Sequence, residues 1–182
     1  MEHRITVRLS SAGIQDAIRQ ITEYKEWLER KTAELSQALA DIGLKTAQVT
    51  AAGASFEYFY RARSQGAKDA GQKWEHLTVP ADITVSAVPT ERGYRIEANG
   101  HDVCFVEFGT GVYYNGDESY PGQRPPGIVG IGEFGQGLGK NRYWNIGGGV
   151  YTNGFPALAP MFEASYEMRG RIADIAREVF SS

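Results

Sequence analysis

The spacing of apolar residues in the first quarter of the chain predicts an amphipathic helix over residues 11–42. Isoleucine and leucine recur there at helical steps, which places their side chains on one stripe. The stripe consists of Ile14, Ile18, Ile21, Leu28, Leu35, Leu39 and Ile42. Ser10 or Ser11 can cap the start of the helix, and Gly43 is its expected end. Because an unbroken helix would be about 45–50 Å long, we expect a kink near residues 22–25, and packing against a sheet rather than a coiled-coil seam.

Runs of alternating or densely apolar residues predict strands elsewhere in the chain. The predicted strands are residues 3–9, 56–60, 82–88, 94–98 and 103–108. Residues 89–93 and the dipeptide Asn99-Gly100 have the composition of tight turns. With such short connections, the last three strands are expected to form an antiparallel meander over residues 83–108.

Residues 109–154 differ in kind, because they contain most of the glycines of the chain and show no regular periodicity. A loop of this length in a compact domain is usually functional, and we expect a long arm. Its aromatic residues are not typical of a flexible linker, so we expect some of them to contact neighbouring subunits. These expected contacts are Tyr113, Tyr114, Tyr120, Tyr143, Trp144 and Tyr151. Beyond the arm, an apolar stripe from Met161 to Val179 predicts a C-terminal helix, and Pro160 suits its first turn.

Length and charge agree with one α+β domain over residues 1–182, in which both helices cover a mainly antiparallel sheet. The 182 residues carry a formal net charge of -3, which argues against a protein that grips nucleic acid through a basic surface. The single cysteine, Cys104, cannot form an intramolecular disulfide, as is usual in a reducing cytoplasm. No run of about 18 apolar residues predicts a membrane span.

His101, Asp102 and Cys104 are the first candidate for chemistry, since together they resemble a metal or nucleophile cluster. On a strand, alternate side chains point to opposite faces, so His101 and Cys104 would diverge. Residues 130–135 match the dinucleotide pattern G-x-G-x-x-G, but further glycines follow where the required helix would begin. We therefore expect no metal and no cofactor.

Glu107 is the second candidate, because it places one carboxylate inside an apolar run. As a general acid of a glycosidase it would need a second carboxylate, such as Asp102, Asp117 or Glu118. As a structural residue it would bind backbone N–H groups of the following turn, or pair with an arginine across an interface. Two carboxylates near a loop are common in proteins, so we favour the structural role and predict no catalytic residue.

Residues 105–111, Phe-Val-Glu-Phe-Gly-Thr-Gly, resemble the hallmark of a family of tailed-bacteriophage tail components, known as tail-completion, neck or minor tail proteins. In that family an apolar strand ends in Glu-Phe-Gly-Thr, and a variable loop, a proline segment and an amphipathic helix follow. Residues 154–161 resemble the approach to that helix, and residues 31–47 resemble the family's long N-terminal helix. The chain departs from the family in its longer, more aromatic loop and in the reversed order of Phe155-Pro156.

The resemblance implies a structural, non-enzymatic protein of the virion that assembles as a ring at the head–tail junction or the tail end. It implies contacts with other neck and tail proteins, an isolated chain free to be monomeric, and DNA only as passing cargo. It also implies synthesis in the host bacterial cytoplasm and no contact with a membrane. The motif residues Glu107, Phe108, Gly109, Thr110 and Gly111 would fix the turn that launches the arm. Two alternatives stay open, a tail-associated cell-wall glycosidase using Glu107 and a host-glycan-binding module using arm aromatics such as Trp144.

Overall fold

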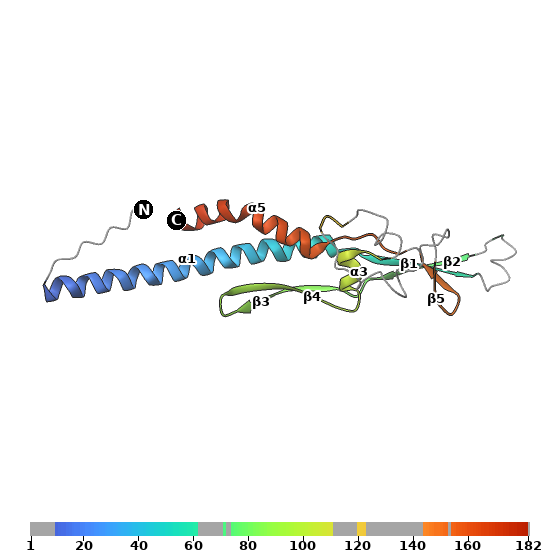
Figure 1. The fold of residues 1–182 in the computed structure, drawn as a ribbon, viewed down its shortest axis with the longest axis horizontal. Helices are drawn as coiled ribbons and strands as arrows, with labels where there is room; N and C mark the ends of the chain where they lie inside the picture. The colour runs from blue at the N-terminus through green and yellow to red at the C-terminus, as the bar shows by residue number, and fades with distance from the viewer. Residues whose placement is uncertain are drawn as a thin grey trace.

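A computed structural model of the chain describes residues 10–61, 71, 74–110, 120–122, 144–152 and 154–181. The molecule is long and thin, with two helices and a hairpin towards one end and a small sheet at the other (Figure 1). The order of elements is α1 (Ser11–Ala51), β1 (Ser55–Arg61), β2 (Trp74–Pro80), β3 (Thr84–Thr90), β4 (Gly93–Asn99), α3 (Val103–Phe108), β5 (Trp144–Gly147), β6 (Val150–Thr152) and α5 (Pro160–Ser181). The predicted α+β class is confirmed. The strand predicted at residues 3–9 lies outside the described residues.

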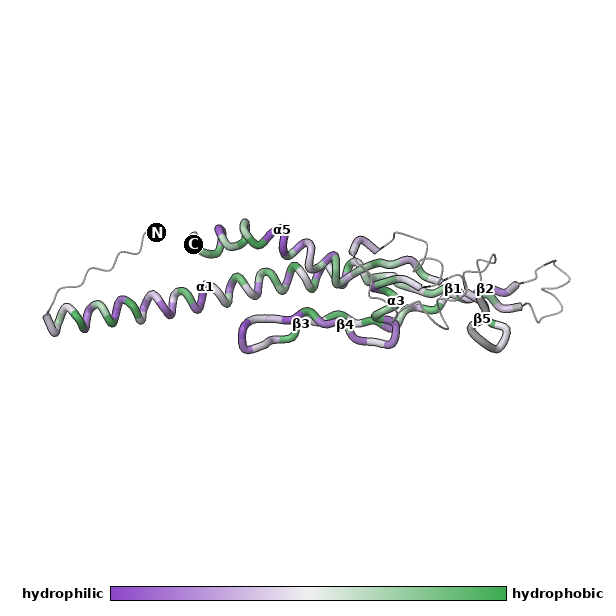
Figure 2. The backbone as a smooth tube through the Cα atoms, in the orientation of Figure 1, coloured by the Kyte–Doolittle hydropathy of each residue, from purple (hydrophilic) through white to green (hydrophobic). Residues whose placement is uncertain are grey.

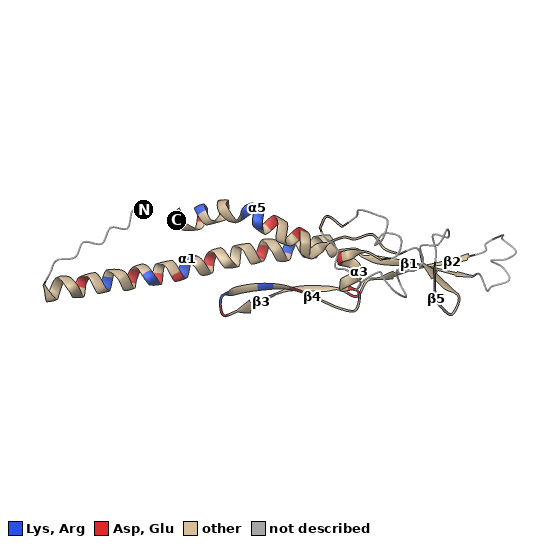
Figure 3. Cartoon of the chain, in the orientation of Figure 1, with Lys and Arg blue, Asp and Glu red and all other residues tan. Residues whose placement is uncertain are grey.

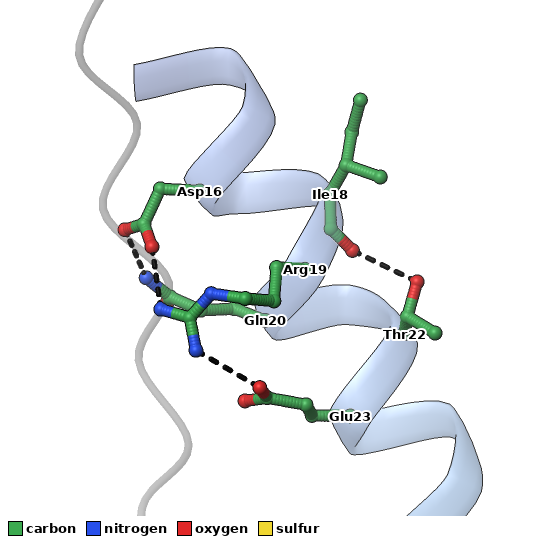
Figure 4. A network of polar contacts seen from close by, with 6 residues as sticks. All are labelled: Asp16, Ile18, Arg19, Gln20, Thr22 and Glu23. Carbon is green, nitrogen blue, oxygen red and sulfur yellow. Dashed lines mark hydrogen bonds and ion pairs between the residues drawn. The ribbon is translucent and has the colours of Figure 1, made fainter. Parts of the chain in front are cut away.

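Helix α1 runs for 41 residues without a break, so the predicted kink near residues 22–25 is wrong. It begins where the Ser10 hydroxyl accepts a hydrogen bond from the backbone N–H of Gly13 at 3.1 Å, as predicted for a serine cap. The Thr22 hydroxyl donates to the carbonyl of Ile18 at 3.0 Å, which satisfies the threonine within the helix (Figure 4). The skipped position in the apolar stripe therefore leaves the helix uninterrupted.

Gly43 lies inside α1, so the prediction that it ends the helix is also wrong. It is buried against α5, where a Cβ atom added to Gly43 would lie 2.6 Å from the sulfur of Met168. Farther along, the ring of Trp27 on α1 meets Phe180 on α5 edge to face, with ring centroids 5.8 Å apart. These two contacts show that α1 and α5 pack antiparallel, and that a glycine permits their close approach. The predicted C-terminal helix, with Pro160 in its first turn, is confirmed.

The strands form two separate antiparallel sheets. One has four strands in the order β2-β1-β6-β5, and the other is the hairpin of β3 and β4. The hairpin lies along α1, where the Gln48 amide donates to the carbonyl of Val85 at 3.1 Å. The strands predicted at residues 56–60, 82–88 and 94–98 are confirmed, whereas β2 was not predicted. The prediction that residues 109–154 lack regular structure is wrong for the described part, because β5 and β6 form a hairpin that joins β1.

Residues 103–108 form helix α3, so the predicted third strand and the three-stranded meander are wrong. The backbone N–H of Val106 donates to the carbonyl of Asp102 at 2.9 Å, and that of Gly109 to Phe105 at 2.9 Å. Val106 is fully buried and packs with Ala54, Phe56 and Phe155 in the main apolar cluster. This short helix thus lies at the junction between the helical part and the sheet (Figure 1).

Charged residues of both signs alternate along α1 (Figure 3). On its exposed face Arg19 bridges Asp16 at 2.6 Å and Glu23 at 2.9 Å (Figure 4). Because all three side chains are exposed, these pairs add little to stability, but they neutralise the surface locally. No helix among the described residues is both long and apolar enough to cross a membrane.

Candidate functional site

The residues of the Glu-Phe-Gly-Thr motif meet the segment before α5 and hold it by hydrogen bonds. We call this arrangement of residues 106–110 and residues 155–162 the clasp. It begins at Gly109, which ends α3 with a φ of 75°. A Cβ atom at Gly109 would lie 2.9 Å from the carbonyl oxygen of Phe155 and 2.9 Å from the backbone nitrogen of Ala157. Glycine is therefore required at this position for two reasons: the backbone has a positive φ, and the backbone of residues 155–157 lies too close for a side chain.

Thr110 forms a reciprocal pair of hydrogen bonds with Phe155. The backbone N–H of Thr110 donates to the carbonyl of Phe155 at 2.8 Å. In return, the backbone N–H of Phe155 donates to the hydroxyl of Thr110 at 2.9 Å. Both residues are buried, so these bonds satisfy polar groups that would otherwise lose water without replacement.

Val106 adds a second set of backbone contacts one turn earlier in α3. Its carbonyl accepts from the N–H of Leu158 at 2.9 Å and from that of Ala159 at 3.4 Å. Ala159 has a φ of 53°, a left-handed conformation that costs free energy for any residue with a Cβ atom. The strained residue directly precedes Pro160, and it turns the chain from the clasp into α5.

The carboxylate of Glu107 caps the N-terminus of α5. Its Oε2 accepts from the backbone N–H of Met161 at 2.8 Å, and its Oε1 accepts from that of Phe162 at 3.1 Å. The first turn of a helix has N–H groups without partners inside the helix, and a negative charge is favourable there. Glu107 is only 6% exposed, and burial raises its pKa, while the bonds from α5 and from the Tyr120 side chain oppose the rise and Glu163 adds to it.

Three aromatic rings pack together beside the clasp. The ring of Tyr120 meets Phe108 with centroids 5.0 Å apart and Phe162 with centroids 5.7 Å apart, both edge to face. Gly122 also packs against this cluster, since a Cβ atom there would lie 3.0 Å from the ring of Phe162. Part of the predicted arm therefore returns to the motif, and it packs against both α3 and the start of α5.

A pair of aspartates ties the other end of α3 to the hairpin. The carboxylate of Asp102 accepts from the backbone N–H of Asp82 at 2.7 Å, and that of Asp82 accepts from the N–H of His101 at 3.0 Å. The role of Asp102 is thus to hold the backbone next to β3. The structure holds α3 from both ends, which fixes the position of Glu107.

The clasp joins α3 to the start of α5 by hydrogen bonds. Both oxygens of Glu107 accept from backbone N–H groups of α5, and the Tyr120 side chain also bonds to this carboxylate. These partners differ from the two expected ones, the N–H groups of the following turn and an arginine. As a glycosidase acid it would need a free face towards a sugar, and Asp117 and Glu118 lie outside the described residues. His101 and Cys104 are exposed, and no group of three or more His, Cys, Asp or Glu among the described residues could hold a metal ion.

The residues expected to contact neighbouring subunits are only partly described. Tyr113, Tyr114 and Tyr143, like Gly111 of the motif and residues 130–135, lie outside the described residues, as does the side chain of Trp144. Tyr120 packs in the clasp, and the ring of Tyr151 meets that of Trp74 across the sheet with centroids 5.0 Å apart. Both tyrosines therefore pack against aromatic rings of their own chain.

Asp82 was not singled out from the sequence, whereas Phe155 and Leu158 of the clasp were recognised only as members of the segment before the C-terminal helix. No sequence pattern marks Asp82 or Leu158, since their partners lie far away in the chain.

Comparison with known proteins gives no match to a family model, to a curated protein sequence or to a solved structure.

Proposed function

We propose that this chain is a structural component of a bacteriophage tail or head–tail junction, of the tail-completion, neck or minor tail type. It acts by ring-like self-assembly and by contacts with neighbouring neck and tail proteins, without catalysis. DNA passes such a ring as cargo, without sequence-specific binding.

The observation that carries the proposal is the clasp. The two segments that resemble the phage family, residues 105–111 and residues 154–161, are far apart in the sequence and are joined directly in the fold. Their residue types match that joint: a carboxylate for the N-terminus of α5, a glycine for the close approach and a threonine for the reciprocal bonds. A motif whose residues serve the fold favours a structural role over a catalytic one.

The shape of the molecule supports the same proposal. The helices and the hairpin extend from the clasp in one direction and the four-stranded sheet extends in the other (Figure 1). A long subunit with a fixed central joint can contact different neighbours at its two ends, as a connector in a virion must.

The proposal is tested in a phage whose copy of this gene carries an amber stop codon, with the chain supplied from a plasmid. Without the plasmid we expect heads and tails that accumulate as separate particles or with unfinished tails, as seen by negative-stain electron microscopy. The wild-type chain should restore infectious particles, and Gly109→Ala should restore far fewer. The matched control is Gly53→Ala, which has a similar positive φ but nothing within 4 Å of the added Cβ atom. Normal, infectious particles in the absence of the chain would refute the proposal.

The glycosidase alternative is separated by Glu107→Gln in the same system. If the chain degraded cell walls, this variant would lose wall-clearing activity in a turbidity assay while particles assembled normally. The structural role predicts no clearing activity for the wild-type chain, and fewer particles for the variant.

A further inference from the structure

The first turns of α1 carry an apolar stripe that faces solvent. Ile14, Ile18, Ile21 and Leu28 are 48%, 59%, 54% and 40% exposed. They lie on the stripe that the sequence predicted for packing against a sheet. We call these four residues the seam. Four large aliphatic side chains on one exposed helical face indicate a missing partner.

Within the described residues, α5 ends before it reaches most of the seam. Near the end of α5, the ring of Phe180 contacts that of Trp27 on α1, and α1 continues well beyond the end of α5 (Figure 1). Apolar positions recur along this extension of α1 (Figure 2). In proteins most of the stability of a helix comes from the packing of its amphipathic face, so a partner on this face would stabilise the extension.

The spacing of the seam fits a second helix as the partner. Ile14, Ile21 and Leu28 are separated by steps of seven, and Ile18 and Lys25 form the adjacent row. This is the pattern of a coiled-coil face, in which two rows of side chains interlock with those of another helix.

The charges beside the seam favour a copy of the same chain over a strongly charged partner. Residues 11–30 hold four acidic and three basic side chains, so the segment is nearly neutral. Several of them already pair within the helix, as Arg19 does with Asp16 and Glu23 (Figure 4), and Lys25 does with Glu29 at 3.6 Å. Two copies therefore approach without marked repulsion, and no excess charge calls for an oppositely charged partner.

We infer that the seam pairs with the seam of a second copy of this chain, and that the two helices run antiparallel. In a parallel pair, the two Lys25 ammonium groups would face each other across the seam. In an antiparallel pair centred between Ile18 and Ile21, the stem of Lys25 packs beside Ile14 of the other copy and its charge reaches water.

The β3–β4 hairpin sets the limit of the overlap. Residues 89–94, which contain its turn and the ends of both strands, line an open groove together with Leu28, Thr32 and Ser36 of α1. A partner helix that follows the seam therefore meets the hairpin just beyond Leu28. An antiparallel pair centred between Ile18 and Ile21 brings residue 11 of one copy opposite Leu28 of the other. In this register the overlap covers the whole seam and ends beside the hairpin.

The size of the seam predicts weak association. Burial of the four seam residues and the stems of their neighbours on both copies would remove roughly 1,000 Å² from water, at the lower end of specific interfaces. A dissociation constant in the range of about 10–500 µM is typical of such transient pairs.

The experiment is sedimentation equilibrium of the full chain over protein concentrations from about 10 µM to about 1 mM, a range that spans the expected constant. The wild-type chain should change from monomer to dimer over this range. The variant Ile18→Glu/Ile21→Glu should weaken the association by about tenfold or more, because it places charges in the seam of both copies. Both sites are more than half exposed, so the monomer should keep its fold, which circular dichroism checks.

The matched control is Ile172→Glu, which makes the same change on α5 at a residue that is 48% exposed and outside the seam. It should associate like the wild-type chain. A wild-type chain that stays monomeric throughout, or a seam variant that dimerises as strongly as the wild-type chain, would overturn the inference. The result is independent of the proposed function, because it is measured on the isolated chain and not on phage particles.

The orientation is tested by electron-spin distance measurements on dimers that carry one label per chain. The labels replace Thr22 or Glu29 in a Cys104→Ser background, which removes the only native thiol. In the antiparallel pair, the two labels should be offset along the helix by about 8 Å at residue 22 and about 28 Å at residue 29, from the helical rise per residue. Equal distances at the two sites would indicate a parallel pair and would overturn the antiparallel arrangement.

Discussion

At the scale of single residues, Glu107 combines two roles that usually belong to different positions. An N-cap residue is normally next to the helix that it caps, whereas Glu107 caps α5 across a separation of 54 residues. Because its carboxylate binds two backbone N–H groups, the start of α5 cannot move without breaking contact with α3. The glutamate thus fixes the geometry between two helices as well as the end of one.

The position of Glu107 makes the stability of the chain depend on pH. Burial is the main cause that raises its pKa above the ordinary value of 4.5, so the folded chain keeps the proton to a higher pH than the unfolded chain does. This contribution to stability is therefore fully present below about pH 4.5 and is lost as the pH rises through the raised pKa. Glu107→Gln has no such titration. As the pH rises through this range, the unfolding free energy of the wild type should fall relative to that of Glu107→Gln. Urea unfolding at several pH values measures both.

The control for the pH dependence is Glu26→Gln, which changes an exposed glutamate on α1. Its unfolding free energy should follow that of the wild type at every pH. A wild-type advantage over Glu107→Gln that grew with pH would mean that the hydrogen bonds from α5 outweigh burial, and that the pKa is lowered.

Gly109 should be hard to replace. Gly109→Ala combines a positive φ of 75° with contacts of 2.9 Å to the backbone of the clasp. We expect a loss of about 3 kcal/mol or more in unfolding free energy, measured by chemical denaturation. Gly53→Ala, with a φ of 79° and open space, should lose only about 1 kcal/mol. Equal losses in the two variants would show that the clasp yields to the added methyl group.

At the scale of elements, a glycine inside α1 sets the distance between the two long helices. Glycine in a helix interior costs about 1 kcal/mol relative to alanine, and Gly43 is accepted because Met168 occupies the space of its missing side chain. We expect Gly43→Ala to destabilise the wild-type chain, since the methyl group displaces Met168. In a Met168→Ala background, the same change should stabilise by about 1 kcal/mol, because the space is then free.

The control for this pair is Gly170→Ala on α5, where an added Cβ atom meets nothing within 4 Å. It should stabilise the chain by about 1 kcal/mol in either background, through helix propensity alone. Thermal or urea unfolding of the wild type, Gly43→Ala, Met168→Ala and the double variant gives the coupling energy between Gly43 and Met168. A coupling near zero would mean that α5 shifts freely along α1.

The elements also show which parts of the fold a sequence can reveal. Both long helices were predictable because their apolar residues repeat over many turns, and the β3–β4 hairpin was predictable because its strands and turn are adjacent. Residues 103–108 were misjudged, since a short apolar run has the same composition in a buried helix as in a buried strand. Gly43 was misread as a helix end because its partner, Met168, lies on another element.

The candidate site was predictable only in part, for a related reason. The residues of the motif were identified in the sequence, but the partners of Glu107 and Thr110 were not. Met161, Phe162 and Phe155 contribute backbone groups to the clasp, and backbone groups leave no mark in the residue types. The joint therefore became visible only when the distant segments were placed together.

At the scale of the whole molecule, a well-packed middle lies between the clasp and an extended end of α1 (Figure 1). The second half of α1 packs on α5 and the hairpin, with Ala40, Gly43 and Ala47 buried. The first turns of α1 extend past α5 and expose the seam (Figure 1). The first turns of α1 should therefore be locally less stable than its second half, because local stability depends on the tertiary contacts that each segment makes.

Hydrogen exchange followed by mass spectrometry tests this picture along the whole chain. At low protein concentration, amides of residues 11–24 should exchange faster than those of residues 31–51 by about 100-fold or more, since opening the first turns breaks few tertiary contacts. At high concentration the exchange of residues 11–24 should slow, because pairing through the seam adds contacts only there, and Ile18→Glu/Ile21→Glu should abolish the slowing. Protection that is uniform along α1 at low concentration would show that the first turns need no partner, and that the helix is held along its full length by its own chain.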